Sequence, residues 1–92
     1  MKFMTTWAVR PGARAEAVDR FLAGQGTPPE GVTLLGRWHK ADASGGYSLT
    51  ESANSQAIFE SAAIWADILE LHSTVVLEDD EAGPILAKHQ KK

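Results

Sequence analysis

VTLLGRWHKADASGGYSLTES, residues 32–52, has the pattern of a β-hairpin, and the other elements of the chain are expected to pack around it. Two strand-like runs, Val32 to His39 and Gly46 to Ser52, flank a polar connection from Lys40 to Gly45. Small residues and a glycine in that connection favour a tight reversal of the chain. We therefore predict that the two runs pair as antiparallel strands.

The two faces of this hairpin differ in chemistry. If Trp38 lies opposite Tyr47, the alternation of side chains divides the strands into two sets. The more apolar face carries Val32, Leu34, Gly36, Trp38, Tyr47 and Leu49. The mixed face carries Thr33, Leu35, Arg37, His39, Ser48 and Thr50. We expect helices to cover the apolar face, and we look for a site on the mixed face.

Hydrophobic periodicity predicts a strand and a helix on each side of the hairpin, and a short helix at the end. The expected elements are a strand over 2–9, a helix over 13–23, the hairpin strands, a helix capped by Ser52 or Asn54, and a strand over 70–78. The second helix carries its apolar stripe at Ile58, Ala62, Trp65 and Leu69. The terminal helix should begin at about Asp80. Pro84 is expected in its first turn or before it, because a later proline removes an interior hydrogen bond.

The order β, α, β, β, α, β predicts a ferredoxin-like α+β domain over residues 1–92, with antiparallel strands in spatial order 4-1-3-2. Helices should cover one face of this sheet. We expect that face to carry Phe3, Trp7, Leu34, Trp38, Leu49, Val75 and Leu77. The uncovered face should carry Thr6, Leu35, Arg37, Ser48, Thr50, His72 and Thr74, with Met4 and Val76. Its apolar residues favour burial against a second copy, so we expect a homodimer.

Composition limits the classes of protein. The chain has 92 residues, a formal net charge of -3 and no cysteine. Zero cysteines exclude disulfides, thiolate metal sites and a cysteine nucleophile. The acidic balance argues against a nucleic-acid partner, and Lys88, Lys91 and Lys92 are expected to form a solvated end. No apolar run reaches membrane-spanning length and residues 1–6 lack the core of a signal peptide, so we expect a soluble cytoplasmic protein that makes no membrane contact.

Arg37 is the most suggestive single residue. On a mixed sheet face beside Ser48, Thr50 and Thr6, it could hold a carboxylate or phenolate by charge-assisted hydrogen bonds. The alternative is an arginine that pairs across a dimer interface or reaches solvent from an edge strand.

His39 and His72 are weaker candidates, as the acid or base of an enzyme. We expect them on the same face but on opposite edge strands. Three strand spacings then separate them by about 14 Å, too far for a shared metal within one chain. His89 lies near the expected frayed end and is weaker still.

Two other groups have a structural interpretation. Trp7, Trp38 and Trp65 with Tyr47 could line an aromatic pocket, but their spacing favours the core between sheet and helices. The acidic run Glu78 to Glu81 is typical of a helix start and lacks the spaced ligands of a calcium loop. The sequence therefore predicts neither a metal nor a cofactor.

Five segments together resemble a bacterial family of small proteins classified only as a domain of unknown function. They are MKFMTTW (1–7), PPEGVTLLGRWH (28–39), SGGY (44–47), WAD (65–67) and VVLEDDEA (75–82). That family is similar in layout to the dimeric α+β barrel superfamily, which implies this fold and a homodimer. Wider relatives include cofactor-free monooxygenases, haem-degrading enzymes, small isomerases and stress-responsive proteins, and by that analogy His72 could ligate haem. No catalytic residue carries over.

The leading hypothesis is a homodimeric barrel that binds a small, partly apolar anion through Arg37. The rival is a structural or regulatory homodimer without a ligand, in which Arg37 serves the subunit interface. A third hypothesis, a cofactor-free oxygenase or isomerase, rests on the resemblance alone.

Overall fold

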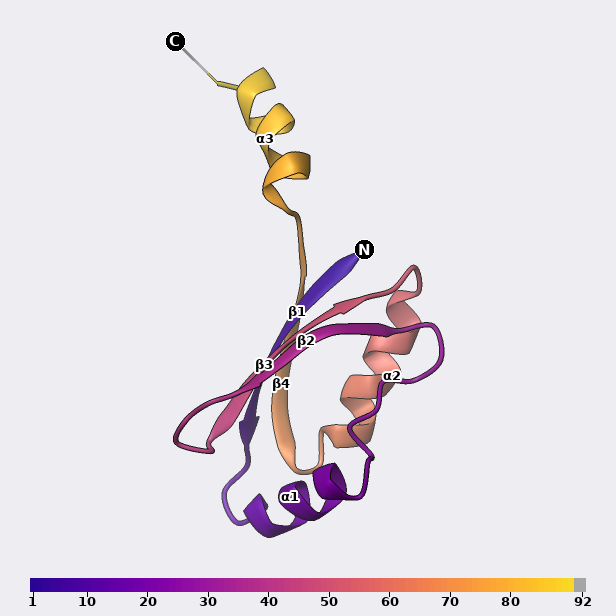
Figure 1. The fold of residues 1–92 in the computed structure, drawn as a ribbon, viewed down its shortest axis with the longest axis vertical. Coiled ribbons are helices and arrows are strands. Elements are labelled where there is room, and N and C mark those ends of the chain that lie inside the picture. Colours follow the sequence, from indigo (N-terminus) through magenta and orange to yellow (C-terminus); the bar gives the residue numbers. More distant parts are fainter. Residues whose placement is uncertain (91–92) are drawn as a thin grey trace.

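The computed structural model describes residues 1–90, so Lys91 and Lys92 of the predicted solvated end lie outside the described residues. Seven elements follow one another along the chain (Figure 1). They are β1 (Lys2–Val9), α1 (Arg14–Leu22), β2 (Thr33–His39), β3 (Gly45–Glu51), α2 (Ser55–Trp65), β4 (Leu69–Val76) and α3 (Asp79–Lys88).

The four strands form one antiparallel sheet in the order β2-β3-β1-β4. This arrangement is compatible with a ferredoxin-like fold and confirms the predicted strand order. Trp38 lies opposite Tyr47, so the predicted hairpin register is also confirmed. α1 and α2 both lie on one side of the sheet (Figure 1). We call the other side, on which Met4, Thr6, Trp38 and Tyr47 lie, the open face.

For Arg37 to His39 and for β3, the side of the hairpin that faces the helices is the reverse of the predicted one, whereas Leu34 lies on the predicted side. Ser48 pairs with Thr5 of β1 and with Arg37 of β2, so all three side chains point toward the helices. Trp38 and Tyr47 therefore lie on the open face, where they are 55% and 43% exposed. Thr50 also lies on the helix side, whereas Thr33 and Leu35 are exposed and lie outside the cavity lining, in agreement with their predicted place on the uncovered face.

A β-bulge and a glycine explain this reversal. The pairing of β2 with β3 shifts between Leu34 and Gly36, so strict alternation fails at Leu35. Leu34 and Arg37 consequently share the helix side, although three positions separate them. On β3, a Cβ atom at Gly46 would lie 2.5 Å from the indole of Trp7, so the missing side chain makes room for that ring.

The tightly packed core is small. Ala17, Ile68 and Leu69 are buried together, with Trp7 and Trp65 packed against them. Leu69 belongs to β4 and not to the stripe of α2, because α2 ends at Trp65. Leu77, predicted on the helix side, lies after β4 and is 58% exposed.

Helix α2 begins at the predicted cap. The side chain of Asn54 accepts a hydrogen bond of 2.9 Å from the backbone N–H of Gln56. A cap of this kind satisfies one of the free N–H groups in the first turn and is worth about 1 kcal/mol. Asn54, and not Ser52, is thus the N-cap.

Helix α3 extends away from the rest of the molecule (Figure 1) and has no buried residue. Glu78 and Glu81 form a capping box at its start. Because the helix begins at Asp79, Pro84 is its sixth residue, and the prediction that Pro84 lies in or before the first turn is wrong. The capping box and the acidic first turn stabilise the start of this helix.

An ion pair between Arg20 and Asp67 connects α1 to the turn between α2 and β4. The guanidinium of Arg20 donates to both carboxylate oxygens of Asp67, at 2.6 and 3.1 Å, and to Glu16 at 2.9 Å. These hydrogen bonds from Arg20 hold the pKa of Asp67 below its ordinary value. A pKa that is lower in the folded chain stabilises the fold above the ordinary carboxyl pKa, and that contribution is lost as the pH falls through the folded value.

We therefore expect that in Asp67→Asn the free energy of unfolding depends less on pH in the acidic range than it does in the wild type. Below about pH 4 the free energies of unfolding of the wild type and the variant should converge, while at neutral pH the wild type is more stable. Urea denaturation at a series of pH values measures this. Asp19→Asn is the control, because Asp19 forms no ion pair within residues 1–90. A constant difference between wild type and Asp67→Asn at every pH would contradict the expectation.

Candidate functional site

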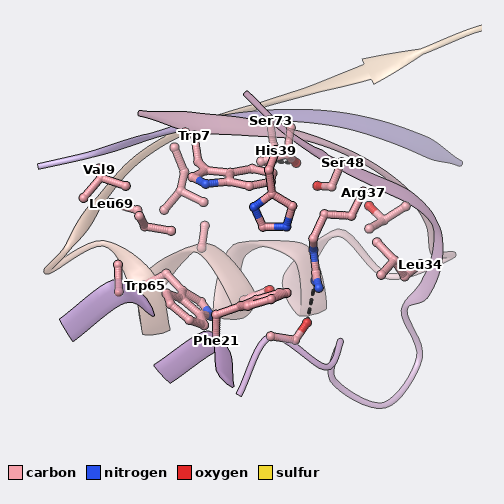
Figure 2. A pocket seen from close by; sticks show the side chains of 18 of the residues that line it. Trp7, Val9, Phe21, Leu34, Arg37, His39, Ser48, Trp65, Leu69 and Ser73 are labelled. Carbon is pink, nitrogen blue, oxygen red and sulfur yellow. Dashed lines mark hydrogen bonds between the residues drawn. The ribbon is translucent and has the colours of Figure 1, made fainter. Parts of the chain in front are cut away.

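A cavity of about 300 Å³ lies between the sheet and the two covering helices (Figure 2). This volume is at the lower end of the range for small-molecule sites. Strand residues form one wall, with Trp7, Arg37 and His39 among them, and Phe21 of α1 and Trp65 of α2 lie opposite (Figure 2). The site therefore lies where a ferredoxin-like domain usually has its core.

Arg37 projects from β2 across this cavity toward Phe21 (Figure 2). Its Nη2 atom donates a hydrogen bond of 2.5 Å to the backbone carbonyl of Gly26, and its guanidinium carbon lies 5.6 Å from the centre of the Phe21 ring. Burial lowers the pKa of Arg37 because it disfavours the charged form. Arginine still stays protonated at neutral pH, so a positive charge lies in a partly desolvated place.

No carboxylate compensates this charge: none of the ion pairs among residues 1–90 includes Arg37. The lining of the cavity is basic as a whole. It includes Arg14 and Lys40 besides Arg37 and His39, and it contains no Asp or Glu among the described residues. In a chain of net charge -3, this makes the cavity a local region of positive potential.

His39 lies two positions after Arg37 on β2, so both side chains point into the same space. Its imidazole meets the rings of Trp7 and Phe21 edge-on, with centroids 5.6 and 5.1 Å away. The ring thus bridges the sheet and α1 (Figure 2). Arg37 and His39 together stand along the β2 edge of the cavity.

Hydroxyl groups supply the other polar atoms of the wall. Ser48, directly opposite Arg37 on β3, and Thr50 both line the cavity. The Thr50 Oγ1 atom is buried and has no hydrogen-bond partner within the part of the chain that the structure describes. A buried hydroxyl without a partner is unfavourable by about 1–3 kcal/mol, so this atom would gain from a polar group placed in the cavity.

The residues predicted as a site divide into two groups. Arg37, Ser48, Thr50 and His39 come together in the cavity, and not on the uncovered sheet face where we expected them. Thr6 and His72 lie on the open face, where they are paired across β1 and β4. His39 and His72 are consequently on opposite faces of the sheet, which corrects the prediction that they share one.

Sequence reasoning missed the helix side of the site. Phe21 falls within the helix predicted over 13–23 and Gly26 falls outside every predicted element, yet both contact Arg37. Trp7 and Trp65 were predicted as core and do lie between sheet and helices, where they also line the cavity. A usable signal was present in β1 and β4: Thr5 and Ser73 are polar at positions that face the helices.

The acidic residues at the start of α3 lie close together. One carboxylate oxygen from each of Glu78, Asp80 and Glu81 falls within 4.8 Å of the others, and all three residues are exposed. Glu78 and Glu81 form the capping box, and Lys2 pairs with Glu78 at 2.7 Å. Capping and charge pairing account for this cluster.

The fold and the cavity define a small α+β protein of ferredoxin-like layout with a basic, aromatic-lined internal site. Residues 1–90 match the family described as Domain of unknown function (DUF3303), and the chain belongs to that family. No curated protein and no solved structure matches the chain. None of the helices within residues 1–90 has the length and apolar character needed to cross a bilayer.

Proposed function

We propose that this protein binds a small, partly apolar anion in the cavity, with Arg37 as its anchor. The observation that carries the proposal is the half-buried, uncompensated charge of Arg37 in a cavity lined by further basic groups and no acidic ones among residues 1–90. Burying an unpaired charge is costly, and an anionic ligand would offset that cost.

The walls of the cavity favour an apolar body for this anion. Trp7, Phe21 and Trp65 offer ring faces and edges, while Arg37 and the hydroxyls of Ser48 and Thr50 lie together on β2 and β3. Sites for small organic molecules typically combine an apolar lining with a few fixed polar groups. A planar carboxylate is the simplest molecule with both properties, and trans-cinnamate is a suitable probe.

Arg37→Ala should weaken the binding of trans-cinnamate by about 10- to 100-fold, because hydrogen bonds to charged groups contribute about 1.5–3 kcal/mol. Isothermal titration calorimetry at neutral pH measures the two dissociation constants. His72→Gln is the matched control, since His72 lies on the open face and pairs only with Glu70, at 3.3 Å, within residues 1–90. Equal affinity of the wild type and Arg37→Ala would rule out Arg37 as the anchor.

We also propose that the protein is a homodimer of the dimeric α+β barrel type, closed by the open faces of two copies. Met4, Trp38 and Tyr47 on that face are 36%, 55% and 43% exposed, more than a solvated sheet face needs. Helix α3 also favours association with a second copy of the chain. An isolated helix of ten residues is marginal in water, and α3 exposes Ile85 and Leu86 without packing on its own chain.

The ligand-free homodimer is the alternative, and the position of Arg37 argues against it. That hypothesis needs Arg37 on the face that a second copy covers, whereas its side chain lies on the helix side. A cofactor-free oxygenase or isomerase is a further candidate within the same site. His39 favours it over a purely binding role, because an imidazole beside the anion anchor is placed to move a proton. His72, on the open face, has no such position.

A further inference from the structure

Four polar side chains form a straight row across the helix-facing side of the sheet. Arg37 pairs with Ser48, Ser48 with Thr5, and Thr5 with Ser73, so each of the four strands contributes one member. All four residues line the cavity. We call Arg37, Ser48, Thr5 and Ser73 the polar row.

The rows on each side of the polar row are mainly apolar. Toward one end of the sheet lie His39, Gly46, Trp7 and Leu71, and toward the other lie Leu34, Thr50, Phe3 and Val75. α2 contributes mostly small or apolar groups to the opposite wall, among them Ile58 and Ala62. A sheet face covered by helices normally buries apolar residues at its centre, so the hydroxyls of Ser48 and Thr5 on the two central strands need a separate reason. Arg37 and Ser73 extend the row onto the two edge strands, and Ser73 is exposed.

The hydroxyls of the row differ in what they bond. Thr5 and Ser73 share a hydrogen bond of 2.8 Å, and this pair keeps free acceptor capacity. Ser48 has no side-chain hydrogen bond within residues 1–90, and the neighbouring Thr50 Oγ1 has no partner there either. Neighbouring strands are about 4.8 Å apart, so the Thr5–Ser73 pair begins about 10 Å from the strand of Arg37.

From this geometry we infer that the ligand is a carboxylate with a thin apolar body and a second oxygen function at its far end. The carboxylate pairs with Arg37, the body lies between the sheet and α2, and the distal hydroxyl bonds to the Thr5–Ser73 pair. The inference rests on the proposed function and adds the second polar group to it. Hydroxyaryl carboxylates are the class of molecule with this pattern.

Two probes with the same body test the inference directly. 4-Hydroxycinnamate differs from trans-cinnamate only by a hydroxyl at the end opposite to the carboxylate. We expect the wild type to bind 4-hydroxycinnamate about fivefold more tightly, as one additional hydrogen bond permits. Isothermal titration calorimetry of both compounds gives the ratio.

The double variant Thr5→Val with Ser73→Ala should remove this preference and keep the affinity for trans-cinnamate within about twofold. Thr6→Val is the control, because Thr6 is the next residue of β1 and points to the open face. It should keep the full preference. Circular dichroism checks that each variant is folded. The affinity ratio of the two compounds for the wild type tests the second polar contact even without a variant.

The outcomes separate the two proposals. Arg37-dependent binding of trans-cinnamate with no gain for 4-hydroxycinnamate overturns the role of the polar row and leaves the anion site intact. A gain that survives in the double variant also overturns it, because the hydroxyl must then bind elsewhere. Binding of neither compound overturns the anion site, and the inference fails with it.

Discussion

Replacing Gly45 with Ala is expected to lower the free energy of unfolding by about 2–4 kcal/mol. A Cβ atom at Gly45 would lie 1.9 Å from the backbone carbonyl oxygen of Trp7 and 3.0 Å from the Cα atom of Ala8. These are backbone atoms of the neighbouring strand, so no side-chain rotation relieves the clash. β3 would have to separate from β1 at the end where the cavity-lining Trp7 is held.

Gly83→Ala is the matched control for this variant. Gly83 lies in α3, and a Cβ atom there would meet nothing within 4 Å. Alanine favours a helix interior over glycine by about 1 kcal/mol, so this variant should be as stable as the wild type or more so. Urea denaturation of the three proteins gives the comparison. A Gly45→Ala protein as stable as Gly83→Ala would show that β3 and β1 are not packed as closely as described.

Trp38→Glu is expected to raise the dissociation constant of the proposed homodimer by about 100-fold or more. Trp38 is the largest exposed side chain of the open face, and aromatic residues at interface centres commonly contribute 2 kcal/mol or more. A carboxylate there would also be buried without a partner in the dimer. Sedimentation velocity over a range of concentrations measures the change.

Two comparisons make this result specific. Phe59→Glu should leave the dimer unchanged, since Phe59 is 77% exposed on α2, away from the open face. Trp38→Glu should also bind trans-cinnamate as the wild type does, because Trp38 is not among the cavity-lining residues. A wild type that sediments as a monomer at every concentration would exclude the dimer, whereas the cavity site does not depend on it.

Local patterns in the sequence were sufficient for much of the fold. The alternation over 2–9 reproduces β1, the turn residues after Lys40 place the hairpin, and Asn54 caps α2 as expected. The pairing of Trp38 with Tyr47 was an assumption that the sequence did not fix, and the structure bears it out. From these elements, the handedness of the connections led to the observed strand order.

The side of the hairpin that meets the helices could not be predicted in the same way. Hydrophobicity favoured Trp38 as a buried residue, but the bulge at Leu35 breaks the alternation on which that choice depends. Arg37 and Ser48 were grouped correctly, because a shared register fixes them relative to each other. Their surroundings were not, since Phe21 and the Gly26 carbonyl reach Arg37 only through tertiary packing.

The small size of the buried core has a thermodynamic consequence. Phe3, Ala17, Ala57, Ile68 and Leu69 are the buried hydrophobic residues within 1–90, and the centre of the molecule is the cavity. A molecule that binds there would contribute apolar contacts that the chain itself does not supply. Since such a molecule binds the folded chain and not the unfolded one, its concentration would shift the folding equilibrium by mass action. The free energy of unfolding would then rise with the concentration of free ligand, so the amount of folded protein would depend on how much ligand is present.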